Sequence, residues 1–345
     1  MPATPDPDPV PLDRVPLVPE PLVPVPRPPA ADRFVYAIPM RTRFRGLTVR
    51  EGVLVRGPAG WGEFSPFWDY DDEESSSWWR AAVEAASDGF PAPVRDRIPV
   101  NVTVPAVDAE TAHRIVLGSG GCRTAKVKVA EPGQDVGAEI ARLEAVRDAL
   151  GPGGAIRVDA NAAWDVPTAV QRLRVLDRAA GGLEYAEQPV ASVADLAAVR
   201  RTVSVPIAAD ESIRRAADPL AVARAEAADV VVLKVQPLGG VRACLHLAER
   251  VGLPVVVSSA LETSVGLAAG IALAAALPEL PYACGLATAQ LLTADVVDVS
   301  LLPQDGAITV ARPAPGLGTL DAVRAPDDVA ERWLDRLARV EALVR

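Results

Sequence analysis

From about residue 97 onward, the chain alternates short apolar runs with longer amphipathic stretches, at a spacing of about 25 to 30 residues. The apolar runs are rich in Val, Ile and Ala, as is typical of parallel strands buried on both faces. Between them, stretches such as Val136–Leu150, Pro167–Ala179 and Asp195–Val203 carry charged residues on one side and apolar residues on the other, which predicts surface helices. The predicted strands are Ile98–Val104, Ala125–Val129, Ala155–Asp159, Leu183–Glu187, Pro206–Asp210, Val230–Lys234, Pro254–Ser258 and Tyr282–Leu286. Eight strands alternating with helices predict a closed α/β barrel.

A different pattern precedes the barrel. Strands at Phe34–Pro39 and Gly52–Arg56 lead into a helical stretch at Ser75–Ala86, which predicts a separate α+β cap. The barrel pattern ends near residue 300, and Asp327–Arg345 predicts a helix that packs back on the cap or the barrel exterior. The predicted domains are a Pro-rich tail at 1–32, an α+β capping domain at 33–96, a barrel at 97–300 and a C-terminal segment at 301–345 that returns to the cap.

The first 32 residues hold 12 of the chain's 33 prolines and lack the charged region and apolar stretch of a secretory signal. They predict a disordered or polyproline-type tail. The longest clean apolar run, Val265–Leu277, is too short to span a bilayer and is closed by Pro278. No membrane insertion is therefore expected.

The charge pattern narrows the class of partner. The net charge is −10 and no dense Lys/Arg patch is visible, which argues against nucleic acid or an acidic lipid surface and favours a small-molecule substrate. Cys122, Cys244 and Cys284 are widely spaced among small or apolar residues, which predicts reduced core thiols and a cytoplasmic location. The sequence leaves the oligomeric state open, a homo-oligomer included.

Lysine is rare in this chain: Lys and Arg together number 35, yet only three are lysines. Lys126, Lys128 and Lys234 all stand in apolar runs, and strand alternation places the first two on the same face. A partly desolvated lysine next to another cation can act as a base near neutral pH, which arginine cannot readily do. One such lysine is often only a solvated strand end, but three in buried strands indicate chemistry.

Three carboxylates, Asp159, Glu187 and Asp210, end successive predicted strands. The carboxyl ends of parallel barrel strands converge on one face, where barrel active sites are built. A single Asp at such a place often only caps the next helix. Three in consecutive units predict a metal site, and oxygen ligands without His or Cys suit Mg²⁺ or Mn²⁺ better than zinc.

The order of these motifs resembles the muconate-lactonizing branch of the enolase superfamily. The motifs are Lys126-Val127-Lys128, Asp159-Ala160-Asn161, Glu187-Gln188-Pro189, Asp210-Glu211-Ser212 and Lys234, with Trp61–Pro66 in the cap, and the resemblance covers about residues 33–320. It implies a modified TIM barrel with an α+β capping domain. Within the branch, the combination of Glu187-Gln188-Pro189 with Ser258–Ser264 most resembles the motifs of a hydro-lyase of menaquinone biosynthesis. The Pro-rich tail departs from the family pattern.

The resemblance and the residue chemistry imply abstraction of a proton next to a carboxylate, with Mg²⁺ on the three carboxylates neutralising the enediolate charge. Lys128 is the expected base, because Lys126 and the metal disfavour its charged form. In the implied dehydration, Lys128 then protonates the departing hydroxyl. Lys234 is expected to stay cationic on the opposite side and to stabilise the intermediate.

Residues around this centre have weaker signals. Asn161 and Glu211 are expected to orient ligands or hold the lysines, with turn or helix-cap roles as an equal alternative. Ser258, Ser259 and Glu262 are expected to shape the substrate pocket through backbone N–H groups and a helix start, with a Ser-rich turn as the alternative.

The cap's mobile substrate loop is expected at Arg41–Gly46, which makes Arg41 and Arg43 candidate substrate ligands, although the segment carries no recognisable specificity signature. His113 and His246 lie in predicted outer helices and are assigned no role.

Other functions remain open at this point. Lys128 and Lys234 on opposite faces could run a two-base racemisation or epimerisation of an N-acylamino acid. A metal-free aldolase would use one lysine as a Schiff base, against which the three carboxylates argue. A further alternative is a non-catalytic binding protein built on the same barrel. The complete set of lysines and carboxylates argues against it, because binding alone does not require that set.

Overall fold

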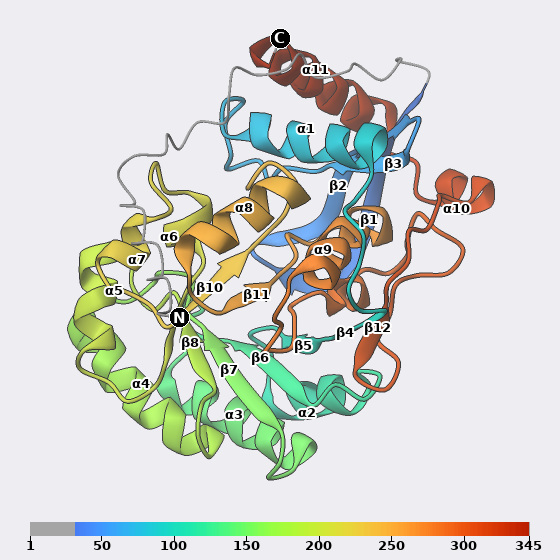
Figure 1. Cartoon of the computed structure of the whole chain (residues 1–345). Helices are drawn as coiled ribbons and strands as arrows, with labels where there is room; N and C mark the ends of the chain where they lie inside the picture. Colours follow the sequence, from blue (N-terminus) through green and yellow to red (C-terminus); the bar gives the residue numbers. More distant parts are fainter. Residues whose placement is uncertain (1–31, 345) are drawn as a thin grey trace, which may run out of the picture.

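The structure is a computed structural model, and it describes residues 32–344. The predicted tail falls almost wholly on residues 1–31 and lies outside the described residues, as does Arg345 at the end of the predicted C-terminal helix. In the described part, an α/β barrel and an α+β cap lie against each other (Figure 1), which is the predicted fold class.

Among residues 32–344, seven parallel strands form the barrel sheet in chain order. They are β5 (Asn101–Val104), β6 (Thr124–Lys128), β7 (Ala155–Asp159), β8 (Tyr185–Glu187), β9 (Ile207–Ala209), β10 (Val230–Leu233) and β11 (Val255–Val257). Bridges from Val100 to Cys284 and from Ser258 to Gly285 close the sheet, so the predicted strand Tyr282–Leu286 is reduced to two bridging residues. A side chain at position 285 would collide with Ser258, so this position requires glycine. Glycine weakens a strand, which explains why the predicted strand is so short.

The first predicted strand, Ile98–Val104, is two strands in the structure. β4 (Arg97–Pro99) pairs antiparallel with β12 (Ala307–Thr309) outside the barrel sheet, and only β5 joins the parallel wall. Pro99, which has no N–H to give to a ladder, is the last residue of β4.

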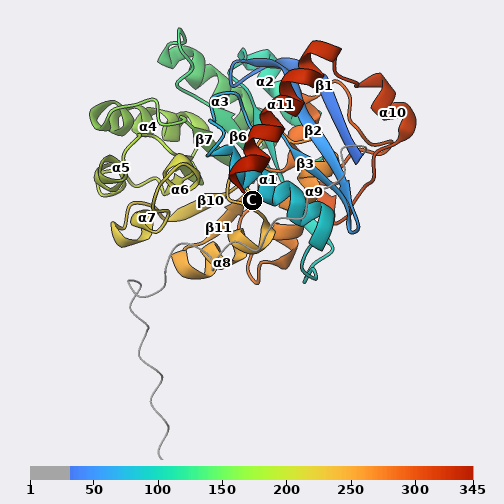
Figure 2. The same cartoon turned by 90° about the horizontal axis from the view of Figure 1, so that it is seen from above.

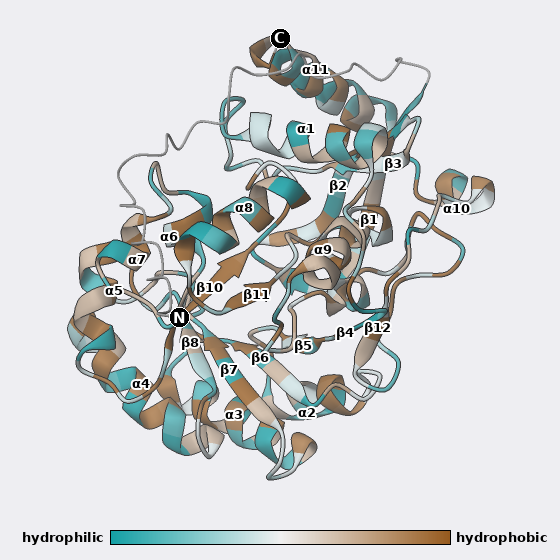
Figure 3. Ribbon diagram, in the orientation of Figure 1, coloured by the Kyte–Doolittle hydropathy of each residue, from teal (hydrophilic) through white to brown (hydrophobic). Residues whose placement is uncertain are grey.

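The barrel helices follow the predicted pattern. α3 (Val136–Leu150) has the predicted bounds, and α4 (Val166–Ala180) and α5 (Val193–Arg200) differ from prediction by a few residues. The remaining ones are α2 (Ala109–Leu117), α6 (Glu211–Arg214), α7 (Ala221–Arg224), α8 (Val241–Val251) and α9 (Ser264–Ala276). Asp135 and Asp165 accept backbone N–H groups at the starts of α3 and α4, as preferred N-caps do. Hydrophilic residues concentrate on the outer sides of these helices (Figure 3).

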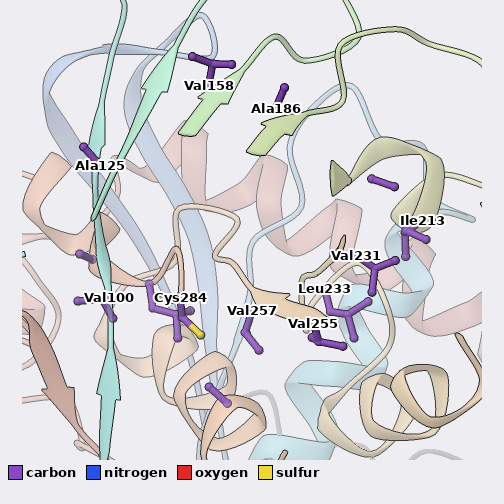
Figure 4. Close-up of a cluster of buried hydrophobic side chains, with 14 of the residues drawn as sticks. Val100, Ala125, Val158, Ala186, Ile213, Val231, Leu233, Val255, Val257 and Cys284 are labelled. Carbon is purple, nitrogen blue, oxygen red and sulfur yellow. The ribbon is translucent and has the colours of Figure 1, made fainter. Parts of the chain in front are cut away.

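The two faces of each barrel strand pack in different places. Val158 and Val231 belong to the large cluster that includes helix residues such as Leu143 (Figure 4). Tyr185 and Val232 belong to a separate small cluster inside the barrel. Since side chains alternate along a strand, the inner face of β8 carries position 187 after position 185. The charged strand ends thus continue the inner face of the barrel.

The cap is a three-stranded antiparallel sheet packed on two helices. It comprises β1 (Arg33–Phe44), β2 (Leu47–Gly57), β3 (Gly60–Phe64), α1 (Ser75–Val83), a π-helical turn (Glu84–Asp88) and α11 (Asp327–Leu343). The ring centroid of Phe64 lies 6.0 Å from that of Trp79 on α1 and 6.2 Å from that of Trp333 on α11. The C-terminal helix therefore packs on the cap, above the barrel in Figure 1. The domain boundaries at 33–96, 97–300 and 301–345 stay a prediction.

The apolar run at Val265–Leu277 forms α9, which packs between the barrel and the cap through contacts with β11, β4 and β3. Twelve of its thirteen residues are buried, so the helix is apolar on all sides. No helix among the described residues is long and apolar enough to cross a membrane. Two short helices, the 3₁₀ segment Ala287–Leu291 and α10 (Leu317–Ala322), complete the chain's path back to the cap, seen from above in Figure 2.

Candidate active site

The structure brings the charged strand ends together. Lys126 and Lys128 lie on β6, and the strand register sets Lys128 beside Asp159 of β7 and Asp159 beside Glu187 of β8. Asp210 and Lys234 directly follow β9 and β10. Asp159, Glu187 and Asp210 are at most 1% exposed. Residues separated by more than 100 positions in the chain therefore share one buried polar centre, as the prediction of a common strand-end face required.

Each lysine lies against a carboxylate. The Nζ atom of Lys126 lies 3.0 Å from both Asp159 Oδ2 and Glu187 Oε1, and the Nζ atom of Lys128 lies 2.6 Å from Asp159 Oδ2. On the other side, Lys234 Nζ is 2.5 Å from Asp210 Oδ2. In this arrangement no three His, Cys, Asp or Glu side chains within residues 32–344 surround a single point as metal ligands. Ammonium groups instead lie between the carboxylates.

The pKa values of the carboxylates diverge because their neighbours differ. Burial raises the pKa of Glu187 to about 7, and the negative charge of Asp159 adds to this effect. Burial acts in the same direction on Asp159, but Lys126 and Lys128 outweigh it and hold the pKa of Asp159 well below its usual range. Arg214 and Lys234 outweigh burial at Asp210 in the same way and lower its pKa.

The pKa values of the two buried lysines diverge as well. Burial disfavours the charged form of Lys126, but Asp159 and Glu187 raise its pKa well above the ordinary value. Burial lowers the pKa of Lys234, the charges of Arg214 and Lys126 act in the same direction, and the carboxylates of Asp210 and Glu187 do not offset them. Lys126 is therefore a fixed cation, whereas Lys234 is easier to deprotonate than an exposed lysine.

Asn161 and Glu211, predicted as supporting residues, connect the two sides of the centre. Asn161 Oδ1 accepts a hydrogen bond from Lys128 Nζ at 2.6 Å, and Asn161 Nδ2 donates to Glu211 Oε1 at 3.2 Å. Arg214 then donates to Glu211 Oε1 at 2.5 Å and to Asp210 Oδ1 at 3.0 Å. This chain of hydrogen bonds fixes the orientation of Lys128 relative to the opposite carboxylate.

Two of the three pocket residues predicted in the segment Ser258–Ser264 line a cavity beside the lysines. A cavity of about 30 Å³ is lined by all three lysines, by Ser258 and Ser259, and by Phe44 and Phe67 of the cap. Ser259 Oγ lies 2.5 Å from Thr288 Oγ1. Glu262 does not line this cavity. It is buried under its own turn, where Oε2 accepts the N–H of Ala260 at 2.7 Å.

The segment Arg41–Gly46 forms most of a hairpin tip and not an open loop. Arg41 to Phe44 complete β1, and Arg45 and Gly46, both with positive φ, make the turn into β2. Arg43 lines a cavity of about 340 Å³ that also borders Lys128 and Asn161. Arg41 lines a separate cavity of about 550 Å³ next to residues 287–295. Phe44 pairs with Leu47 of β2, although the register of the two strands shifts between Pro39 and Phe44.

Phe44 and Lys128 line both the cavity next to Arg43 and the small one around the lysines, and the ring centroid of Phe44 lies 5.3 Å from Lys128 Nζ. The cavity of about 30 Å³ around the lysines has room for no more than a few water molecules. A cyclic substrate is too large for this small cavity alone, whereas the cavity of about 340 Å³ beside the hairpin tip also borders Lys128.

Sequence reasoning missed several residues of the site. Thr103, Phe67 and Thr288 line the cavity but have no charge or motif that could have indicated it. Arg214 stands four residues after Asp210, and this helical spacing could have indicated an ion pair. His113 and His246 lie on α2 and α8, away from the cavity, and His113 pairs with Asp148 at 3.1 Å.

Two enolase domain models match this chain. The one described as "Enolase N-terminal domain-like" matches residues 35–86, and "Enolase C-terminal domain-like" matches residues 108–320. The chain therefore belongs to the enolase superfamily, whose enzymes depend on a divalent metal.

Within the superfamily, the chain is similar to o-succinylbenzoate synthases. The protein of that name from Thermobifida fusca is 70% identical over 277 residues, which cover 80% of this chain and 86% of that protein. The one from Mycolicibacterium smegmatis is 51% identical over 310 residues, covering 90% and 95% of the two chains.

Solved structures at lower identity share the fold. The muconate lactonizing enzyme from Pseudomonas fluorescens, complexed with muconolactone, is 22% identical with a TM-score of 0.70 and covers 88% of this chain and 97% of that one. The L-Ala-D/L-Glu epimerase from Bacillus subtilis is 24% identical with a TM-score of 0.69, covering 83% and 96%. These distant structures show the fold alone, so they do not distinguish a dehydratase from a racemase. That distinction rests on the residues of the site and on the relatives of higher identity.

Proposed function

We propose that this protein is an o-succinylbenzoate synthase, a hydro-lyase that converts 2-succinyl-6-hydroxy-2,4-cyclohexadiene-1-carboxylate to 2-succinylbenzoate in menaquinone biosynthesis. The observation that carries this conclusion is the 70% identity, over 277 residues, with the Thermobifida fusca protein of that name. The site supports it, because two lysine-bearing strand ends face each other across three buried carboxylates.

Asp159, Glu187 and Asp210 are the proposed ligands of a divalent metal, and Mg²⁺ is the proposed ion, with Mn²⁺ as a substitute. The donor set fits, because it consists only of carboxylate oxygens on consecutive strands. Burial and the charge of Asp159 raise the pKa of Glu187 to about 7, and a divalent cation bound there would favour its charged form. When bound, the metal would neutralise charge on the substrate carboxylate as the enediolate forms.

Lys128 is the proposed base and acid. Among the three lysines, it alone borders both the small cavity and the larger one next to the hairpin tip. It takes the proton next to the substrate carboxylate and returns it to the departing hydroxyl, so that water leaves and the proton count balances. Asn161 and Asp159 orient its ammonium group. Lys126 stays charged and holds Asp159 and Glu187 in place.

Lys234 is proposed to face the substrate from the other side and to stabilise the enediolate while it is protonated. The same residue favours a second candidate function, racemisation of N-succinylamino acids or a related epimerisation. Its pKa is lowered by burial, and it lines one cavity with Lys128, as two opposed bases require. Ser258 and Ser259 are proposed to receive the distal polar end of either substrate.

One experiment separates the two functions. Purified protein is given the cyclohexadiene substrate, and formation of 2-succinylbenzoate is followed by absorbance. Parallel reactions follow N-succinylamino acids by chiral chromatography. A kcat/KM for dehydration far above that for racemisation supports the proposal, and the opposite order assigns the protein to the racemases. Chelator should abolish turnover and Mg²⁺ should restore it, whereas full activity of metal-free protein contradicts the proposed ligand set.

A cytoplasmic location completes the proposal. Cys122, Cys244 and Cys284 are buried free thiols, as is expected of a protein in a reducing compartment.

A further inference from the structure

The turn that carries Ser258 and Ser259 continues into two residues held by the capping domain. Arg50, on β2 of the cap, is only 2% exposed. Its Nε donates to the carbonyl oxygen of Leu261 at 2.9 Å, and its Nη2 donates to that of Ala260 at 3.2 Å. Ala260 and Leu261 line the same cavity as the three lysines. One cap side chain thus reaches across the domain interface to two backbone groups of the pocket wall.

The guanidinium of Arg50 is itself held in place by the cap. Nη1 donates to the carbonyl oxygen of Glu51 at 3.1 Å, and Nη2 donates to Ser65 Oγ at 2.9 Å and to the Ser65 carbonyl oxygen. Its central carbon lies 4.7 Å from the ring centroid of Phe67, which also lines the cavity. Because the cap fixes the planar guanidinium on one side, the donors that the guanidinium presents to the Ala260–Leu261 turn are rigid.

The turn requires such a restraint, because Leu261 has a φ of 65°. This left-handed conformation is unfavourable for a residue with a branched side chain and persists where the surroundings impose it. The carbonyl groups of Ala260 and Leu261 accept bonds from Arg50, and the N–H of Leu261 is bonded to Ser259 Oγ at 3.1 Å. The backbone of the turn is therefore fixed in part from the other domain.

A second cap residue holds the far end of the same turn. Glu63 on β3 accepts the N–H of Thr263 and the N–H of Gly266, each at 3.1 Å. Arg50 thus binds two carbonyl groups before position 262, and Glu63 binds two N–H groups after it. The cap supplies complementary charges to both ends of the segment between Ala260 and Gly266.

We propose that Arg50 is a positioning residue for substrate binding: it holds the Ala260–Leu261 turn so that the wall of the pocket next to Ser258 and Ser259 has one fixed shape. This inference rests on the proposed function for the identity of the substrate. Arg50 does not touch the lysines or the carboxylates, so its loss should weaken substrate binding and leave proton transfer largely intact.

Three variants test the proposal. Arg50→Met keeps the length of the side chain without its donors, and Arg50→Lys keeps the charge without the planar fork. Arg56→Met is the matched control, because Arg56 is exposed on the same strand and stacks only on Trp61 of the cap. Steady-state dehydration gives kcat and KM, and hydrogen exchange measures protection of the amides of residues 260–266.

The expected result is a rise in KM of at least about tenfold for both Arg50 variants, with kcat within about threefold of wild type, because two charge-assisted hydrogen bonds are lost. Exchange should accelerate at residues 260–266 and stay unchanged in the barrel strands. Arg56→Met should match wild type. A purely structural role would lower kcat through loss of folded enzyme and leave KM unchanged, and that result overturns the proposal.

The exchange measurement separates failure of this inference from failure of the proposed function. If wild-type protein does not dehydrate the substrate, the proposed function falls, and faster exchange at residues 260–266 still supports Arg50 as the residue that holds the turn. If wild-type protein is active and the Arg50 variants match it in KM and in exchange, the inference falls and the proposed function stands.

Discussion

Glu262 offers a quantitative test, because the residue is only 3% exposed and its Oε2 accepts the N–H of Ala260. Burial, with the charge of Glu63 added, raises its pKa to about 7 from an ordinary 4.5. Between these two values the folded protein holds a proton that the unfolded chain has released. The free energy of unfolding therefore falls as the pH rises through this window.

The size of the effect follows from the two pKa values. At about 1.4 kcal/mol per pH unit, the full difference is worth about 3 kcal/mol, and about 2.5 kcal/mol of it falls between pH 5 and pH 8. Glu262→Gln keeps the shape of the side chain and an acceptor for the Ala260 N–H, but it carries no charge at any pH. The stability of the variant relative to wild type should therefore increase by about 2.5 kcal/mol from pH 5 to pH 8.

Urea unfolding followed by circular dichroism at both pH values measures this difference. Groups remote from position 262, Glu187 included, titrate in wild type and variant alike, so they cancel in the comparison. Glu249→Gln on the exposed side of α8 is the control, and its stability should differ from that of wild type by the same amount at both pH values. A difference between Glu262→Gln and wild type that is the same at pH 5 and pH 8 refutes the reasoning.

Three further predictions concern the site. Lys128→Arg keeps a cation but removes the base, so kcat should fall by at least about 10²-fold with the circular dichroism spectrum unchanged, and near-normal turnover would exclude Lys128 as the base. Asp210→Asn leaves Lys234 and Arg214 facing a neutral amide, so calorimetry should show weaker Mg²⁺ binding and urea unfolding a loss of about 3 kcal/mol; unchanged Mg²⁺ affinity would remove Asp210 from the ligand set. Phe44→Ala removes a ring that lines both cavities beside Lys128, so KM should change in steady-state kinetics while Mg²⁺ affinity does not, and an unchanged KM would show that the substrate does not contact Phe44.

The barrel and its polar centre could be predicted because both depend on local sequence. Alternation along a strand determines which side chains face inward, and the parallel arrangement brings the ends of β6 to β10 to one face. Lys126, Asp159 and Glu187 could therefore be grouped from spacing alone.

Contacts between the domains could not be predicted in this way. Arg50 reaches Leu261 across 211 positions, and nothing in the sequence around either residue indicates the pair. Glu262 looked like a pocket residue because it stands beside the serines, but the left-handed conformation at Leu261 turns it into the interior. The third cap strand was not predicted, because Gly60 and Gly62 interrupt the alternation of side chains. In the structure, Gly62 allows β3 to lie close to the backbone of Ala82 on α1.

The place of α11 on the cap has a consequence for how the chain is made. Arg336 of α11 is 2% exposed and donates to the carbonyl oxygens of Pro66, Phe67 and Tyr70, so the segment that leads from β3 to α1 is completed by residues that are synthesised after the whole barrel. On the ribosome, the barrel strands all emerge before this helix does. A chain halted before α11 would therefore carry every lysine and carboxylate of the buried polar centre, but the cap that holds the pocket turn through Arg50 would still lack its second helix.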